Sequence, residues 1–316
     1  MKQIADRSSA LLEIEGKGAG QCDRLLRRYA RCERCLARDS INNRKKESAM
    51  TTIDFKFGTL IRTGPKLVNG GKWDAELNED VRNAQKNADL TIYISVFFQK
   101  IDPAVGKSGT HGDADGKNRA IQKWAPGEFE RYTRRLVSGA QRFWTDVFWL
   151  KTPDRYTGLN WPDSNPKVRC NVSCKLELEQ AKASDAAHYT IAVVRVKDGE
   201  PFRSHSRLYS QRDIQPEHMI QRSTAKFWTH FHEVGHLLGL GHVGHGGKHN
   251  HVGNEPTAYG VAMLEMQDVM GRGSHRHAWH ATPWQEAAAT FTSTKPADWV
   301  VSMGHGVAHV PTPLRS

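Results

Sequence analysis

The sequence predicts a mixed strand-and-helix domain, α/β in the broad sense and α+β by the stricter naming, from three observations. Segments typical of strands and of helices are mixed in the first half of the 316 residues. A helix with a buried face is indicated later in the chain, within residues 227–242. With 38% hydrophobic residues, a chain of this length can bury a core. We therefore expect a mixed twisted sheet packed beside an internal helix.

The first 49 residues differ in composition from the rest of the chain. They are rich in arginine, have apolar residues at helical spacing, and end in a polar stretch. This pattern predicts an appended helix and linker: a pro-segment, a delivery segment, or a stretch upstream of a start at Met50. From Thr51 the apolar and polar residues alternate, which predicts a strand. We therefore place the domain at residues 50–316.

The next elements follow from local periodicity. The pattern predicts a helix at Asp74–Asn87, a buried strand at Leu90–Gln99, a helix at Glu128–Arg142 and a strand at Phe143–Leu150. Between the first strand and the second helix lies a loop rich in glycine and aspartate, Val105–Lys117. This loop completes neither a phosphate-binding pattern nor a calcium-loop spacing. It is therefore predicted to be a flexible surface loop.

Two further strands precede the internal helix. Lys175–Glu179 alternates strictly, and His188–Val196 is β-branched and largely apolar, as in a central strand. We expect Phe202–Tyr209 to be the edge strand along which an extended substrate binds. Near the end of the chain, a helix start is predicted by Thr282 as N-cap, Pro283 in the first turn and Gln285 as the capping-box partner.

The internal helix carries a pattern of metal ligands. His232 and His236 are four residues apart, so both imidazoles project from one side of a helix and can share one metal ion. Glu233 lies beside them and can accept a proton from a metal-bound water. Gly239 is expected to end the helix and to turn the chain back, bringing His242 to the metal. Three histidines would leave a fourth coordination position open, as in a catalytic site.

These residues complete the motif HExxHxxGxxH, and the chain here resembles the metzincin family of zinc metallopeptidases. The segment DVMGRG, residues 268–273, is similar to the Met-turn of that family. The resemblance implies Zn²⁺ as the cofactor and a zinc-bound water activated by Glu233. It also implies that Met270 forms the floor beneath the three histidines. The implied fold has an upper subdomain, about residues 50–241, and a lower subdomain, about residues 242–316, that ends in a helix.

The chain departs from the family pattern after the Met-turn. Several metzincins have a tyrosine two residues beyond the methionine, whereas this chain has Arg272. In its place, Arg272, His275 or His277 could donate a hydrogen bond to the oxyanion that develops during hydrolysis. The alternative is that these residues form a solvated basic loop.

Further histidines and the cysteines leave alternatives open. His245, His249 and His251 lie in a glycine-rich loop and are interpreted as solvated, with a second metal site as the alternative. Five cysteines are too few for a disulfide scaffold, although Cys170 and Cys174 are close enough in sequence to pair.

The predicted function is that of a zinc-dependent endopeptidase acting on protein or peptide substrates. The alternatives are a zinc amidase acting on cell-wall peptides, and a basic binding protein with a non-catalytic metal site. The net charge of +11 is interpreted as a soluble basic surface, because no nucleic-acid-binding motif accompanies it. Contact with an anionic polymer or surface, including nucleic acid, is the alternative. The sequence shows neither a signal peptide nor a membrane span, which predicts a cytoplasmic location or export by a signal-peptide-independent route.

Overall fold

The computed structural model describes residues 73–78, 88–106, 108–159, 168–217, 219–220, 226–243, 256–304 and 312–313. All of these lie in the same compact unit of the chain. The predictions for residues 1–49, for the boundary at residue 50 and for the strand from Thr51 lie outside the described residues. So do the predictions for His245, His249 and His251.

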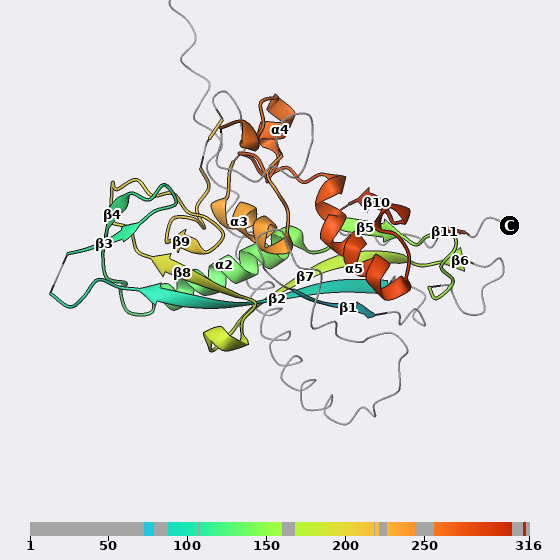
Figure 1. Ribbon diagram of the computed structural model, residues 1–316, viewed down its shortest axis with the longest axis horizontal. Coiled ribbons are helices and arrows are strands. Elements are labelled where there is room, and N and C mark those ends of the chain that lie inside the picture. The colour runs from blue at the N-terminus through green and yellow to red at the C-terminus, as the bar shows by residue number, and fades with distance from the viewer. Residues whose placement is uncertain are drawn as a thin grey trace, which may run out of the picture. The chain divides into compact units, whose positions relative to one another are not determined.

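A mixed seven-stranded sheet forms the centre of the described part (Figure 1). Six of its strands follow the order β10-β5-β7-β2-β8-β9. The seventh, β1, pairs with β2. The strands are β1 (Asp74–Asn78), β2 (Ala88–Ile101), β5 (Phe148–Lys151), β7 (Asn171–Gln180), β8 (Tyr189–Val194), β9 (Leu208–Ser210) and β10 (Val300–Met303). The neighbours β7, β2, β8 and β9 are parallel, and the pairs of β1, β5 and β10 are antiparallel. The expected mixed sheet is therefore confirmed.

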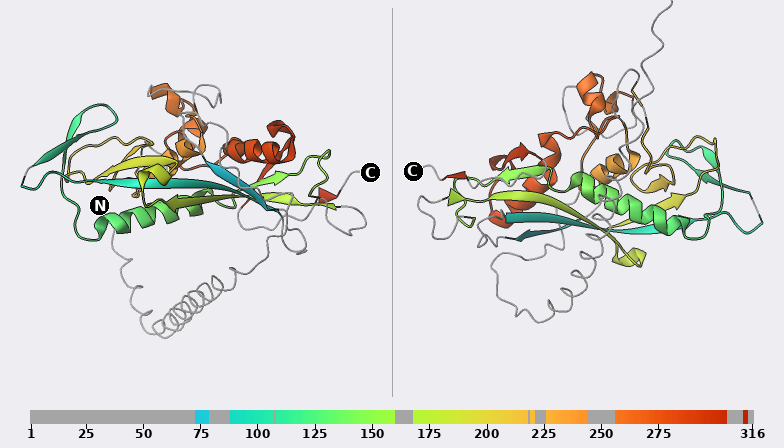
Figure 2. Two further views of the ribbon diagram at one scale, coloured as in Figure 1. Left: turned by 60° about the horizontal axis from the view of Figure 1, so that its bottom comes forward. Right: turned by 180° about the vertical axis from the view of Figure 1, so that it is seen from behind.

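The long central strand β2 explains where the core lies. Its alternate residues Leu90, Ile92, Ile94 and Val96 are all fully buried, and each contributes about 1.5–3 kcal/mol by leaving water. The residues between them are half-buried and mostly polar. Strand β2 therefore buries one of its two faces completely, as the period of two requires. Figure 2 shows that this sheet twists along its length.

Four α-helices accompany the sheet in the described residues: α2 (Glu128–Trp144), α3 (Thr229–Leu238), α4 (Met263–Gln267) and α5 (Thr282–Thr292). Buried residues of α2, α3 and α5 join those of β2 in one hydrophobic core. Figure 1 shows α3 beside α2, and the two helices are in contact. None of the described helices has the length and apolar character needed to cross a membrane. The architecture is mixed α+β, as predicted.

The predicted helix at Asp74–Asn87 is wrong for its first five residues. Residues 74–78 form β1, which pairs antiparallel with Asp89–Tyr93 of β2. Ala75 and Leu77 are fully buried, which is a period of two. Pairing with a buried neighbour has overridden the helix propensity of Ala, Glu and Leu. Residues 79–87 lie outside the described residues.

The predicted strand at Phe143–Leu150 begins too early. Helix α2 continues to Trp144, because this fully buried residue lies four positions after buried Ala140 and extends the same apolar face. The chain then turns at Asp146, which has a positive φ of 58°, and β5 starts at Phe148.

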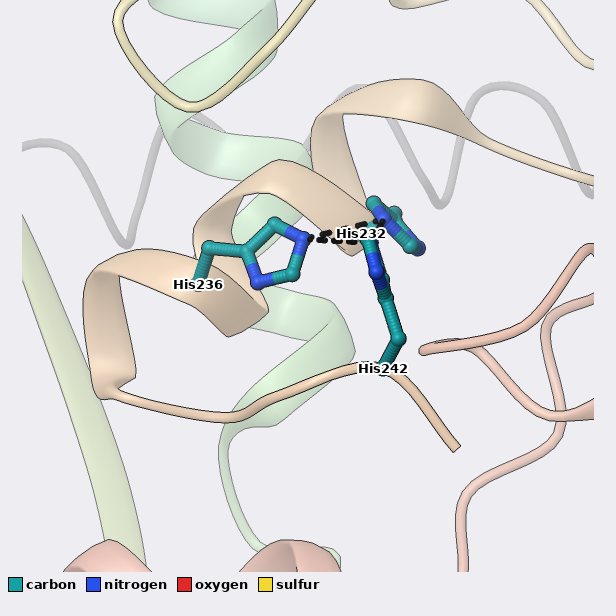
Figure 3. A group of neighbouring side chains, drawn as sticks. All are labelled: His232, His236 and His242. Carbon is teal, nitrogen blue, oxygen red and sulfur yellow. Dashed lines mark hydrogen bonds between the residues drawn. The ribbon is translucent and has the colours of Figure 1, made fainter. Parts of the chain in front are cut away.

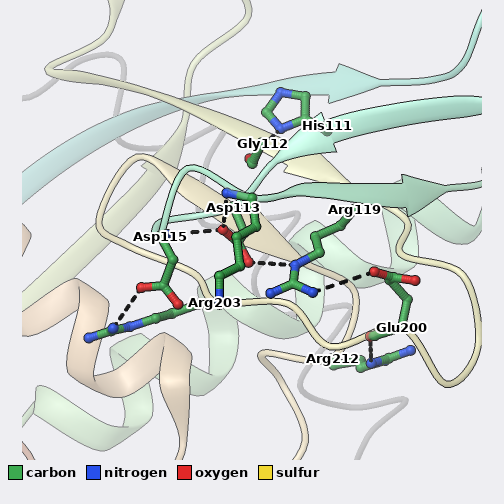
Figure 4. A network of polar contacts seen from close by, with 9 residues as sticks. His111, Gly112, Asp113, Asp115, Arg119, Glu200, Arg203 and Arg212 are labelled. Carbon is green, nitrogen blue, oxygen red and sulfur yellow. Dashed lines mark hydrogen bonds and ion pairs between the residues drawn. The ribbon is translucent and has the colours of Figure 1, made fainter.

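The predicted flexible loop at Val105–Lys117 is largely a β-hairpin. Strands β3 (Gly109–Gly112) and β4 (Asn118–Ile121) pair antiparallel. The buried carboxylate of Asp113 closes their turn: it accepts hydrogen bonds from two backbone N–H groups and from Arg119 (Figure 4). Burial alone would raise the pKa of Asp113, but these hydrogen bonds, that from Arg119 first, outweigh it and lower the pKa.

The same network connects the hairpin to the loop before β9. Asp115 accepts a hydrogen bond of 2.8 Å from Arg203, and Arg119 lies 3.6 Å from Glu200 (Figure 4). The hairpin therefore helps to hold Arg203, whose other contacts are described below.

Two smaller predictions are also decided. Helix α5 begins at Thr282, as expected within one residue, but Thr282 donates its hydroxyl to Trp279 rather than capping the helix. The Gln285 side chain donates to the carbonyl of Trp299, so no capping box forms. Cys170, directly before β7, and Cys174, within β7, are buried free thiols.

Candidate metal centre

Helix α3 carries two of the three histidines and ends where the sequence predicts. Gly239 is the C-cap residue, with a φ of 99° that favours glycine. The N–H of Leu240 then donates to the carbonyl of Gly235, which turns the chain back along the helix. This return brings His242 beside His232 and His236.

The three imidazoles converge through their Nε2 atoms (Figure 3). The Nε2 atom of His236 lies 3.1 Å from that of His232 and 3.1 Å from that of His242, and the third distance is 3.3 Å. A tetrahedral ion with Zn–N bonds of 2.0–2.1 Å would hold such nitrogens about 3.3 Å apart. Within the described part of the chain, these residues form a group that can hold a metal ion.

The other ring nitrogens fix the tautomers of two of these histidines. His232 Nδ1 lies 2.8 Å from the carbonyl of Val269, and His236 Nδ1 lies 2.8 Å from the carbonyl of Leu240. A carbonyl only accepts, so each Nδ1 donates a proton and each Nε2 presents a lone pair. Burial lowers the pKa of both rings, which keeps them neutral. Converging lone pairs repel one another unless a cation lies between them, so the donor set fits a metal ion.

The turn around Met270 lies directly against α3. Met270 is fully buried, and its backbone N–H donates to the carboxylate of Asp268. A Cβ atom built on Gly235 would lie 2.4 Å from the Met270 sulfur. The preceding residue, Val269, holds His232 through its carbonyl. The turn therefore contacts α3 between the two helical histidines and also orients one of them.

We expect Gly235→Ala to lower both stability and metal affinity. The added methyl group must displace the Met270 sulfur, which is fully buried, and overpacking of this kind costs about 1–3 kcal/mol. This exceeds or cancels the gain of about 1 kcal/mol from replacing glycine in a helix. Displacement of a supporting group should also weaken metal binding by about 10 to 100-fold. Thermal unfolding and a zinc competition titration measure the two effects.

The matched control is Gly112→Ala, where a Cβ atom would meet nothing within 4 Å. A Gly235→Ala protein with unchanged stability and zinc affinity would show that Met270 does not support the histidines.

A cavity of about 320 Å³ opens beside His232 and is called the metal cavity below. Its walls include His232, Glu233, Asp213, Arg203, Tyr259 and Arg272. Glu233 is buried, and among the described residues no hydrogen-bond partner for its carboxylate is found. Burial first, and the negative charge of Asp213 second, raise the pKa of Glu233 to about 8, although the positive charge of Arg203 acts in the opposite direction. A carboxylate in these surroundings is a strong base whenever it is ionised.

Comparisons with protein-family models, with curated proteins and with solved structures found no match. The site is therefore characterised by its own geometry: a cluster of three histidines that can hold a metal ion.

Of the three residues predicted to stabilise the oxyanion, only Arg272 lies at this site. Arg272 lines the metal cavity and lies 5.8 Å from the centre of the Tyr259 ring. His275 is exposed and does not line it. His277 faces Asp268 instead, with 3.7 Å between its Nε2 atom and the carboxylate.

Two residues of the metal cavity were not predicted from the sequence. Tyr259 packs its ring 4.2 Å from that of His242, and its hydroxyl lies 3.3 Å from Arg203. A tyrosine 17 positions after the last ligand belongs to no motif, so the sequence offered no signal for it. Arg203 falls within the predicted edge strand Phe202–Tyr209, but only Leu208 and Tyr209 of that range are in β9. The prediction of a strand is wrong for residues 202–207, and residues 202–204 line the metal cavity instead.

Proposed function

We propose that this chain is a zinc-dependent endopeptidase of the metzincin type. The observation that carries the proposal is the convergence of three histidine Nε2 atoms within 3.3 Å of one another, with the Glu233 carboxylate buried beside them. Supporting it are the full HExxHxxGxxH spacing and the Met270 turn that contacts α3 at Gly235.

The metal would be held by His232, His236 and His242. Nitrogen donors in a near-equilateral triangle suit Zn²⁺ and leave a fourth position for water or substrate. When bound, Zn²⁺ would polarise the scissile carbonyl and make an attacking water more acidic.

Glu233 supplies the proton transfers. Its carboxylate accepts a proton from the attacking water and then delivers that proton to the leaving nitrogen. Glu233 is buried in the wall of the metal cavity, and no described side chain competes for its oxygens. A nearby cation would favour the ionised form that this role needs.

The oxyanion requires hydrogen-bond donors on the same side of the cavity. The Tyr259 hydroxyl and the guanidinium of Arg203 are 3.3 Å apart, and Arg272 lies over the Tyr259 ring. These groups can donate to developing negative charge. We therefore assign Tyr259, held by Arg203, as the principal donor in place of the tyrosine that several metzincins have after the Met-turn.

The test is cleavage of a peptide library by the full chain, together with its zinc content by mass spectrometry. We expect close to one zinc per chain, cleavage that 1,10-phenanthroline abolishes, and recovery when zinc is restored. Peptidoglycan cleavage without peptide cleavage would indicate the amidase instead. A zinc-loaded chain that cleaves neither substrate would indicate a binding protein, and both of these outcomes contradict the proposal.

A further inference from the structure

A second cavity, of about 450 Å³, lies on the other side of the first turn of α3. Residues 230 and 231 line it, whereas residues 232 and 233 line the metal cavity. At 100° per residue, these two pairs face away from each other. The second cavity is called the arginine cavity, because Arg135, Arg142 and Arg276 line it together with Trp228, His230 and Phe231.

The described walls of the arginine cavity carry positive charge, and both Arg135 and Arg142 are exposed. No carboxylate lines it, and neither Arg135 nor Arg142 has an ion-pair partner among the described residues. Arg276 is half-buried, donates to the carbonyl of Phe143, and lies 4.5 Å from the centre of the Phe143 ring. Burial lowers the pKa of Arg276. Gathered guanidinium groups are stabilised by an anion, to which they present forked N–H donors.

His230 adds an acceptor to the same cavity. It is 3% exposed, and its Nδ1 lies 2.8 Å from the carbonyl of Asp213, so Nδ1 carries the proton. The remaining nitrogen, Nε2, is an acceptor that faces Gly139 of α2, a residue of the cavity wall. Among the described residues, Nε2 has no hydrogen-bond partner. An acceptor in a cavity wall can bind a ligand that also donates a hydrogen bond, or water.

One wall of the arginine cavity is aromatic. The rings of Phe143 and Phe231 are stacked with 4.0 Å between their centres, and Trp228 stacks on Phe231 at 5.5 Å. A planar apolar group can pack on such a surface while its charged end reaches the arginines.

We propose that the arginine cavity binds an aromatic anion, a planar ring that carries a phosphate or carboxylate group. The ring packs along Phe231 and Trp228, and the oxyanion is bound by Arg135, Arg142 and Arg276. This site is separate from the histidine cluster and does not depend on the function proposed above.

The test measures binding of phenyl phosphate and of benzoate by calorimetry, on the full chain after zinc removal with EDTA. Inorganic phosphate and benzyl alcohol test the charge and the ring separately. We expect saturable binding of phenyl phosphate or benzoate, at least about tenfold tighter than that of either fragment. The two aromatic anions distinguish a preference for phosphate from one for carboxylate.

The double variant Arg135→Gln, Arg142→Gln should weaken this binding at least about tenfold, because it removes two charged donors. Its control is Arg131→Gln, Arg134→Gln, which removes the same charge from exposed positions of the same helix outside the cavity. The control should change affinity less than about twofold. Equal losses in both double variants, no saturable binding of either aromatic anion, or inorganic phosphate binding as tightly as they do would overturn the proposal.

Discussion

His242→Ala is expected to remove most of the zinc and nearly all hydrolytic activity from the chain. Its Nε2 atom completes the triangle of nitrogens, at 3.1 Å and 3.3 Å from its two neighbours. Without His242, only two of the four positions of a tetrahedral ion would be filled by protein ligands. Loss of a direct ligand should therefore cost more affinity than the 10 to 100-fold typical of supporting residues. Zinc content by mass spectrometry and peptide cleavage measure both losses.

The control is His275→Ala, which removes an exposed histidine outside the metal cavity and should retain zinc and activity. Because His245 is the nearest rival ligand in sequence, His245→Ala belongs in the same experiment and should behave like the control. If His245→Ala loses zinc while His242→Ala keeps it, the HExxHxxGxxH assignment is wrong.

Glu233→Gln is expected to keep the zinc but to lower turnover by at least about 100-fold, the contribution of a general base. Glutamine has nearly the same shape and cannot accept the proton. Since Glu233 has no hydrogen-bond partner among the described residues, the change breaks no polar network. The loss should fall on kcat rather than on KM, because the proton moves in the chemical step.

Glu286→Gln, on α5 and outside the metal cavity, is the matched control and should leave kcat unchanged. Zinc content and thermal unfolding of both variants show whether the site and the fold are intact. Near-normal turnover by a zinc-loaded Glu233→Gln protein would rule out Glu233 as the base, whatever the identity of the metal.

The sequence by itself determined those features that depend on neighbouring residues. A spacing of four places His232 and His236 on one side of a helix, and glycine at position 239 ends that helix where His242 can turn back. The presence of α2 and of the buried strand β2 was also predicted from local patterns, although α2 continues two residues beyond its predicted end. The three-histidine cluster was predictable because all its geometry lies within eleven residues.

Only the tertiary structure decided the features that depend on distant partners. Residues 74–78 became a strand because β2 was there to pair with them. The need for glycine at position 235 came from Met270, 35 residues later. Tyr259 and Arg203 meet in the metal cavity, and arginines of α2 meet Arg276 around His230, across separations that no local pattern spans. Such contacts form through packing of the whole core, so a single sequence carries no periodic signal of them.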